Sequence, residues 1–207
     1  RNFAWEHSIQ QGHDYHWVMD DNIHRFYFYN DNMIKLAGDG TMFAAMEDFV
    51  LQYQSLVMAS PRYFKFTVRR RRNTPLTFNS RIYSCNLIKN DIEHRWRGRY
   101  NEDTDLSLRI LKDGDCTVLF RPFLQEKATT QTVSGGNTEN FYADEGTYRK
   151  SKMLKRMHPD VTTLKRKWGR WHHEVNYRPF KSNELVPDPD APPMRDYDLR
   201  LRPVEDD

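Results

Sequence analysis

Apolar and polar residues recur along the chain at both helical and strand spacings, which together predict an α/β protein. Residues 41–59 place apolar side chains on one face at helical spacing, with Thr41 as N-cap, and predict one long helix. Further helices are predicted at residues 2–11, 102–113 and 148–157. Strands are predicted at residues 15–19, 25–29, 63–68 and 116–123, and one strand or a pair of strands at residues 78–87.

The first predicted strand ends in three polar residues, Asp20, Asp21 and Asn22. Open α/β sheets bind ligands at the carboxyl ends of their strands, so these side chains are candidate ligand contacts. Their oxygens suit a hard divalent cation and the phosphates that such a cation carries. The alternative is a simple turn, since Asp and Asn are common turn residues.

A second polar run, Asn101-Glu102-Asp103, stands at the start of the helix predicted from residue 102. Asn101 can cap that helix, and acids in a first turn are favoured by the helix dipole, so capping alone explains the run. The backbone amides of the first turn would also keep a carboxylate ionised, as a general base requires. Asp103 and Glu102 are therefore candidate bases.

Composition and charge narrow the class of protein. The chain has 207 residues with two cysteines and a net charge of +3, and 38% of its residues are hydrophobic. A run of apolar residues long enough to cross a membrane is absent from the sequence, and the first residues do not read as a signal peptide. Without a cysteine framework or a CxxC pair, a reduced cytoplasmic protein is expected.

Basic residues gather in segments that could contact a polyanion. Residues 1–60 carry three basic and eight acidic side chains, whereas residues 61–99 carry eleven basic and two acidic ones. Two segments stand out, one of four consecutive arginines and one of cations interleaved with tryptophans. The candidate nucleic-acid contacts are Arg69, Arg70, Arg71, Arg72, Arg97, Arg99, Lys165, Arg166, Lys167 and Arg170. A solvated surface is the alternative, since most charge runs are exposed.

The remaining segments divide the chain. Residues 131–140 are polar and glycine-bearing, which is typical of a mobile loop and makes them a candidate lid. Prolines and acids dominate from Ser182 onward and predict an extended tail. We therefore expect a catalytic region at residues 1–181 and a Pro-rich acidic tail at residues 182–207.

The order of these motifs resembles that of the GT-A glycosyltransferases, in which an acidic "DxD-type" motif precedes an "xED" motif and a C-terminal histidine. Here the matching elements are Asp20-Asp21-Asn22, Asn101-Glu102-Asp103 and His172-His173. Three longer stretches, residues 17–23, residues 97–109 and Ser134-Gly135-Gly136-Asn137-Thr138, are similar to the phage TET-associated glycosyltransferases. Asn22 departs from the pattern, because many families have a second acid there.

The resemblance implies a GT-A-like mixed sheet flanked by helices. Because one helix precedes the DxD-type strand, part of the N-terminal nucleotide-binding half is expected to be missing from this sequence. It also implies a metal-dependent, inverting transfer of sugar from a nucleotide sugar to 5-hydroxymethylcytosine in phage DNA, in the cytoplasm of the infected host. The sequence carries no sign of oligomeric state, and no membrane contact is expected.

The resemblance also assigns roles to residues. Asp103 would be the catalytic base, with Glu102 as its substitute, and the metal would be Mn²⁺ or Mg²⁺. The metal ligands would be Asp20, Asp21, Asn22 and one of His172 and His173. The nucleotide sugar would be held by Asp20, Asp21, Gly135, Gly136 and Asn137. Two other functions stay open, a glycosyltransferase of a protein or glycan acceptor and a non-catalytic nucleic-acid-binding module.

Overall fold

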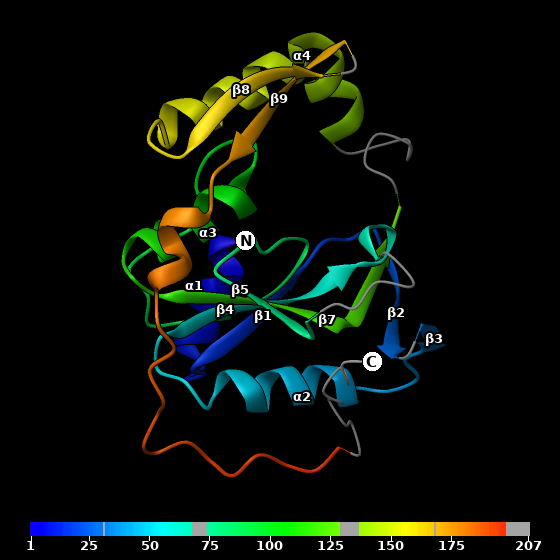
Figure 1. Ribbon diagram of the computed structural model, residues 1–207, viewed down its shortest axis with the longest axis vertical. Helices are drawn as coiled ribbons and strands as arrows, with labels where there is room; N and C mark the ends of the chain where they lie inside the picture. Colours follow the sequence, from blue (N-terminus) through cyan, green and yellow to red (C-terminus); the bar gives the residue numbers. More distant parts are fainter. Residues whose placement is uncertain (31, 68–73, 129–136, 168, 198–207) are drawn as a thin grey trace, which may run out of the picture.

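The chain folds as a mixed sheet with helices on both faces (Figure 1). The computed structural model describes residues 1–30, 32–67, 74–128, 137–167 and 169–197, and for residues 137–146 it describes the backbone alone. The helices are α1 (Asn2–Gln10), α2 (Thr41–Val50), α3 (Glu102–Lys112) and α4 (Asn137–Met157), with short 3-10 turns η1 (Phe64–Phe66) and η2 (Arg178–Ser182).

The main sheet has seven strands. They are β1 (Tyr15–Met19), β2 (Ile23–Asn30), β3 (Met33–Leu36), β4 (Leu56–Tyr63), β5 (Leu76–Phe78), β6 (Cys85–Lys89) and β7 (Cys116–Lys127). Their order is β1-β6-β4-β7-β2-β3, and β5 pairs with β7. The β4–β7 pair is parallel, whereas the other pairs are antiparallel. This mixed α/β architecture is consistent with the GT-A-like fold expected from the sequence.

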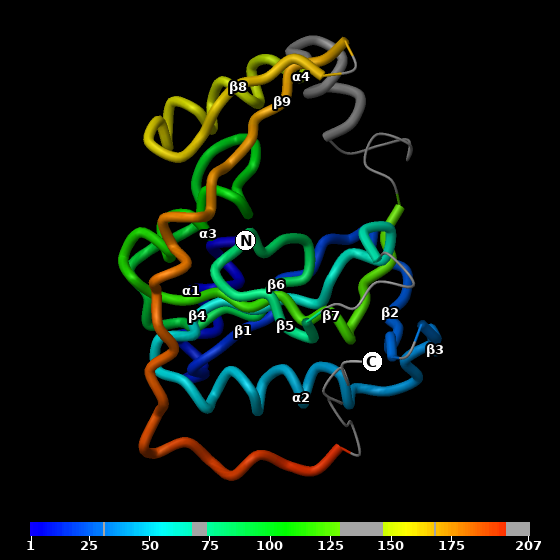
Figure 2. The backbone as a smooth tube through the Cα atoms, in the orientation of Figure 1, coloured from blue at the N-terminus to red at the C-terminus, as the bar shows by residue number. Residues whose placement is uncertain are grey.

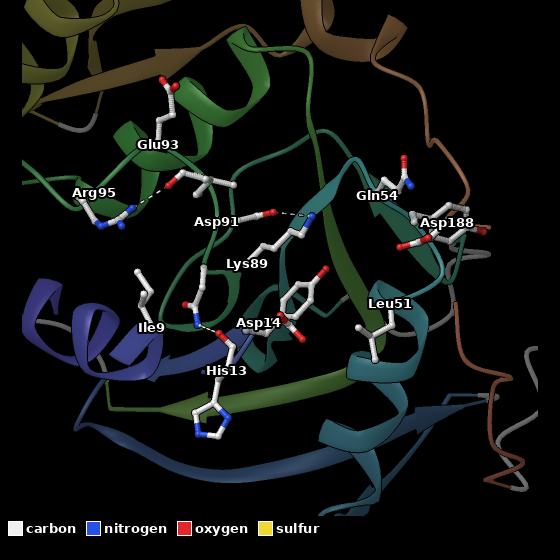
Figure 3. A pocket seen from close by; sticks show the side chains of 14 residues that line it. Ile9, His13, Asp14, Leu51, Gln54, Lys89, Asp91, Glu93, Arg95 and Asp188 are labelled. Carbon is white, nitrogen blue, oxygen red and sulfur yellow. Dashed lines mark hydrogen bonds and ion pairs between the residues drawn. The ribbon is translucent and has the colours of Figure 1, made fainter. Parts of the chain in front are cut away.

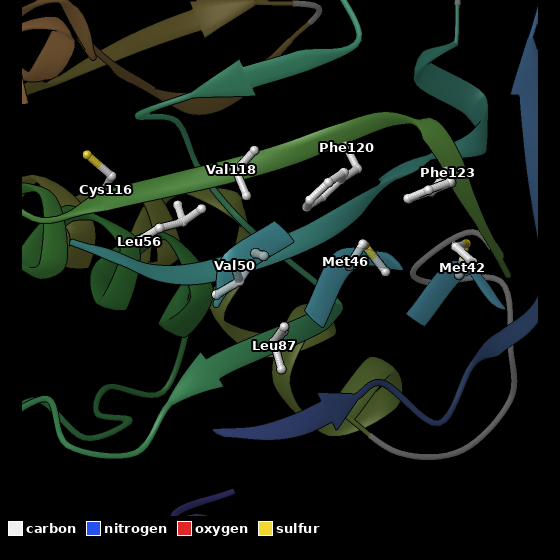
Figure 4. Close-up of a cluster of buried hydrophobic side chains, with 10 residues drawn as sticks. Met42, Met46, Val50, Leu56, Leu87, Cys116, Val118, Phe120 and Phe123 are labelled. Atoms are coloured by element: carbon white, nitrogen blue, oxygen red, sulfur yellow. The ribbon is translucent and has the colours of Figure 1, made fainter. Parts of the chain in front are cut away.

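Two hydrophobic layers hold the sheet between its helices. On one face, Met42, Met46 and Val50 repeat every fourth residue of α2 and pack against Leu87 and other strand residues (Figure 4). On the opposite face, α1 and α3 pack on the neighbouring strand residue, Ile88. Because successive strand side chains point to opposite faces, both layers use the same central strands.

A second unit lies beside the amino-terminal end of α3 and carries one of the two predicted basic segments, at residues 165–170. Strands β8 (Thr162–Lys167) and β9 (Arg170–Val175) form an antiparallel hairpin that packs on α4. Leu154 of α4, Val161 before β8 and Phe180 of η2 form a buried cluster with Leu108 and Leu111 of α3. This cluster fixes the hairpin relative to the helix that carries Asp103.

The segment after η2 runs back along α2 (Figure 2). Pro187 forms an isolated β-bridge with Tyr53. Arg195 places two guanidinium nitrogens at 2.9 and 2.8 Å from the two carboxylate oxygens of Asp48, and the Tyr197 hydroxyl donates to the same carboxylate at 2.7 Å. The described part of the predicted tail is therefore bound along α2.

Two element predictions are wrong. The helix predicted to residue 59 ends at Val50, and residues 56–63 form β4. Leu56 to Ser60 are buried, as a central strand requires, and a helix would have exposed part of this run. The strand predicted at residues 63–68 is also wrong where it is described, because Tyr63 ends β4 and Phe64–Phe66 is a 3-10 turn. None of the described helices is long and apolar enough to span a membrane.

Candidate active site

Asp20 lies directly beyond β1, beside the loop that precedes β6. Antiparallel pairing places Met19 opposite Cys85, and the Asp20 amide donates to the Ser84 carbonyl at 2.7 Å. Ser84 has a φ of 69°, a left-handed conformation that turns its own amide toward α3. The predicted strand at residues 15–19 is confirmed, and its end meets a second polar loop.

Asp103, in the first turn of α3, reaches the same loop. Its Oδ2 accepts from the Ser84 amide at 3.2 Å, and its Oδ1 accepts from the Asn86 side chain at 3.3 Å. Asn101 does not cap α3 with its side chain, which instead donates to the Lys150 carbonyl at 2.9 Å. Asn101 therefore occupies the predicted N-cap position but does not form the expected side-chain cap, and the predicted helix start and the placement of Asp103 in its first turn are confirmed.

The Arg1 guanidinium joins the two predicted acidic motifs. It lies 2.7 Å from Asp20 Oδ1, 2.9 Å from Asp103 Oδ1 and 3.4 Å from Glu102 Oε1. It also stacks over Trp96, with 4.7 Å from Cζ to the ring centroid. Three carboxylates from two distant parts of the chain therefore surround one cation in a single site.

Lys127, at the end of β7, supplies a second cation. Its Nζ lies 3.3 Å from Asp20 Oδ2 and donates to the Ser84 hydroxyl at 2.6 Å. Both oxygens of Asp20 thus face positive side chains. A ligand that binds at Asp20 would therefore lie beside these two cations, which would also attract a phosphate group.

The pKa of the Asp103 carboxyl lies well above that of an ordinary aspartate. Burial raises its pKa to about 6, the neighbouring Glu102 and Asp20 add to the rise, and Arg1 opposes it. The Asp103 side chain is 16% exposed, so solvent reaches part of it. A carboxylate with this pKa is ionised at neutral pH and more basic than an ordinary aspartate, which suits a general base.

The predicted metal ligands fit a hard cation by chemical type, and they lie in two places. Asp20, Asp21 and Asn22 offer oxygens, and the buried Oδ1 of Asn22 has no hydrogen-bond partner among the described residues. By contrast, His172 and His173 belong to β9. In the part of the chain that the structure describes, no three His, Cys, Asp or Glu side chains cluster in a way that could hold a metal.

His173 lines a cavity together with Thr104, the residue after Asp103. Burial lowers its pKa to about 4, and the charges of Lys150 and Arg81 lower it further, so the ring is neutral at pH 7. A neutral imidazole is able to bind metal.

The predicted donor-binding glycines, Gly135 and Gly136, lie outside the described residues, as does most of the candidate lid. Asn137 begins α4, and only its backbone is described.

The predicted nucleic-acid contacts have different surroundings. Arg69, Arg70, Arg71 and Arg72 lie outside the described residues. Arg97 binds the buried Asp105, and the Arg99 guanidinium lies 5.9 Å from the centroid of the Tyr100 ring. Lys165 and Lys167 both pair with Glu174 across the hairpin, and Arg166 and Arg170 are exposed.

Four residues of the site were not predicted as site residues from the sequence, namely Arg1, Ser84, Asn86 and Lys127. Lys127 extends a strand that was predicted to end at Phe123, so its position at the strand end was hidden. Ser84 contributes its amide because of its left-handed loop conformation, and Asn86 contributes its side chain because of the pairing register of β6. Neither feature has a sequence motif. The excess of acids around Asp20 was the available signal for nearby cations.

A larger cavity of about 750 Å³ lies at the opposite end of β1, near Tyr15 (Figure 3). Lys89 and Asp91 form an ion pair there at 3.1 Å, and the Asn90 side chain donates to the His13 carbonyl. None of the predicted site residues lines it. The larger cavity is therefore separate from the carboxylate site.

The comparison with family models places this chain among the glycosyltransferases by family. A family model described as TET-Associated Glycosyltransferase matches residues 1–136, which include Asp20, Glu102, Asp103 and Lys127. The chain belongs to this TET-Associated Glycosyltransferase family. Comparisons with curated proteins and with solved structures gave no match.

Proposed function

We propose that the protein transfers a sugar, with inversion, from a nucleotide sugar to the hydroxymethyl group of 5-hydroxymethylcytosine in DNA. The observation that carries the proposal is the meeting of Asp20, Glu102 and Asp103 around Arg1. These motifs are 82 residues or more apart in the chain, and one site contains both of them. The family membership supports the glycosyl transfer.

Asp103 acts as the base in this mechanism. The acceptor oxygen attacks the anomeric carbon, the bond from that carbon to the diphosphate oxygen breaks, and the acceptor proton passes to Asp103. For this transfer, the hydrogen bond from Arg1 to Oδ1 of Asp103 must be replaced by one from the acceptor hydroxyl. Oδ2 continues to accept the hydrogen bond from the Ser84 amide. That amide fixes the direction of the carboxylate during the exchange.

The leaving diphosphate gains negative charge as the bond breaks. Arg1 and Lys127 both contact Asp20, so the two cations would lie beside a diphosphate bound next to Asp20. A Mn²⁺ or Mg²⁺ held by the side-chain oxygens of Asp20, Asp21 and Asn22 would neutralise the diphosphate further. The acceptor base must leave the helical stack, or be single-stranded, for its hydroxyl to reach Asp103. The proposed setting is the cytoplasm of a phage-infected bacterium.

The proposal is tested by incubating the complete protein with a panel of nucleotide sugars and two matched oligonucleotides. One carries 5-hydroxymethylcytosine and the other carries cytosine, which has no hydroxyl to accept sugar. We expect a mass gain of one sugar on the first oligonucleotide alone, and its loss on adding EDTA. Transfer to a protein or glycan, with none to hydroxymethylated DNA, would refute the acceptor.

A further inference from the structure

A second cavity, of about 380 Å³, borders the carboxylate site. Its lining includes Thr104, which follows Asp103 in α3, and Tyr83, which precedes Ser84. The other walls come from β4, β5, β7, β9 and η1, and from the loop that contains Arg81. A molecule bound in this cavity would therefore lie next to the proposed base.

The cavity is lined with positive charge. Arg62, Arg81 and Arg121 contribute to its walls, and the described residues that line it include no Asp or Glu. Burial lowers the pKa of Arg121, and the charge of Arg62 lowers it further, which shows that like charges are close. Among the described residues, no carboxylate forms an ion pair with Arg62 or Arg81. Gathering like charges costs free energy that a bound anion would offset.

Buried polar atoms on the same walls lack partners. Within the described part of the chain, Arg62 Nε, Ser80 Oγ and Tyr177 Oη are buried without a hydrogen bond. A buried donor without an acceptor typically costs about 1–3 kcal/mol, so a ligand that accepts from these atoms would recover part of that cost. All three can donate a hydrogen bond, and a phosphate oxygen accepts several.

An aromatic surface stands beside the arginines. Phe66 lines the cavity and is 52% exposed, and its ring packs edge-on against Tyr63 at 5.0 Å. The Arg81 guanidinium lies 4.6 Å from the centroid of the Tyr83 ring, which holds it in place. Exposed aromatic faces beside cations are the usual support for a nucleotide base next to its phosphate.

We infer that this cavity is a phosphate-binding subsite for a nucleotide, in which the arginines take the phosphate and Phe66 stacks on the base. The phosphate has two sources, the diphosphate of the sugar donor or the phosphodiester of the acceptor strand. The inference does not require that sugar transfer occurs, because binding alone tests it. It goes beyond the proposed function by giving the residues around Arg81 a role.

The test measures binding to the complete protein of three probes, inorganic pyrophosphate, a nucleoside diphosphate and single-stranded oligothymidylate. Arg81→Met removes a cation that the structure shows only stacked on an aromatic ring, so the fold should persist, as a thermal melt will show. We expect at least one phosphate probe to bind about tenfold or more weakly to Arg81→Met, the effect of losing a charge-assisted contact. The control is Arg178→Met, an exposed arginine of η2 outside the lining.

Phe66→Ala separates stacking from charge. It should weaken the nucleoside diphosphate or the oligonucleotide and leave pyrophosphate unchanged. Loss confined to the nucleoside diphosphate assigns the subsite to the donor, and loss confined to oligothymidylate assigns it to the acceptor strand. Equal affinity of the wild type, Arg81→Met and Arg178→Met for all three probes would overturn the inference. Asp103→Asn, which tests transfer, should keep all three affinities, so the two proposals fail separately.

Discussion

At the scale of single residues, Asp103 is the group on which the proposed chemistry depends. Asp103→Asn keeps the shape of the side chain and removes its ability to take a proton. We expect the rate of transfer to fall by about 10²–10⁴-fold with donor binding little changed. The measurement is steady-state kinetics with hydroxymethylated DNA. Asp113→Asn, at the exposed end of α3, is the matched control and should keep full activity.

The acidity of Asp103 predicts a pH profile. Since burial raises its pKa to about 6, the base is protonated below that pH, and kcat/KM should rise through pH 6 and level off above it. Folding stability should change in the opposite direction. The folded state binds this proton more tightly, so the contribution of Asp103 to stability should fall as pH rises from 3.8 toward about 6. A profile that is flat between pH 5 and pH 7 would contradict the assignment.

Residue types and spacing were sufficient to single out Asp20, Glu102 and Asp103, because carboxylates at a strand end and in a first helical turn have recognisable surroundings. The cations were not predictable in the same way. Arg1, which precedes α1, contacts Asp103 of α3, and Lys127 lies near Asp20 because of the position of β7 in the sheet. Both are tertiary contacts. A single basic residue carries no local pattern that distinguishes such a contact from solvent exposure.

At the scale of elements, α3 is anchored by a fully buried carboxylate. Asp105 accepts hydrogen bonds from Arg97, Arg109 and His158, which join the loop before α3, the helix itself and the end of α4. Burial would raise the pKa of Asp105, but these partners outweigh it and hold the pKa below its usual range. The network positions the helix turn that carries Asp103.

Asp105→Asn should destabilise the protein strongly, because it leaves two arginines partly buried without their counter-charge. Breaking a buried ion pair typically costs about 3–5 kcal/mol in the free energy of unfolding. Denaturant unfolding at pH 7 measures this value, with Asp160→Asn as the control for an exposed pair of Lys112. A cost below about 1 kcal/mol would show that Asp105 does not anchor α3.

The β8–β9 hairpin predicts an effect on nucleic-acid binding. Glu174 faces both Lys165 and Lys167, and it partly neutralises the basic segment. Glu174→Gln should therefore tighten binding to an oligonucleotide and steepen the dependence of log affinity on log salt by about 1–2. Fluorescence anisotropy at several salt concentrations measures the slope. An unchanged slope would show that these lysines do not contact phosphate.

The helix prediction for residues 41–59 succeeded where one face of the segment is exposed and failed where both faces are buried. In α2 the spacing of Met42, Met46 and Val50 identifies a helix. The following apolar run, from Leu56 to Ala59, is buried all round, so its periodicity cannot separate helix from strand. The parallel pairing with β7 settles that choice, and pairing between distant segments has no local sequence signal.

At the scale of the whole molecule, the C-terminal segment closes over α2 through Asp48, Arg195 and Tyr197. Asp48→Asn should loosen it, because the amide cannot form the paired contact with Arg195. Hydrogen exchange of residues 183–197 should become faster in Asp48→Asn, and that of β4 should stay slow. Asp190→Asn, an exposed change in the same segment, is the control. Equal exchange in the two variants would contradict this role of Asp48.

The position of β7 in the sheet has a consequence for synthesis on the ribosome. β7 pairs with β2, β4 and β5, yet it comes last among the seven strands of the main sheet. While residues 116–127 are still inside the ribosome, the aromatic strand β2 has no partner on that edge, and Phe28 lacks its contact with Phe123. Exposed strand edges with apolar side chains favour aggregation. A pause in translation while residues 116–127 are inside the ribosome should therefore reduce the yield of folded protein more than a pause after they have emerged.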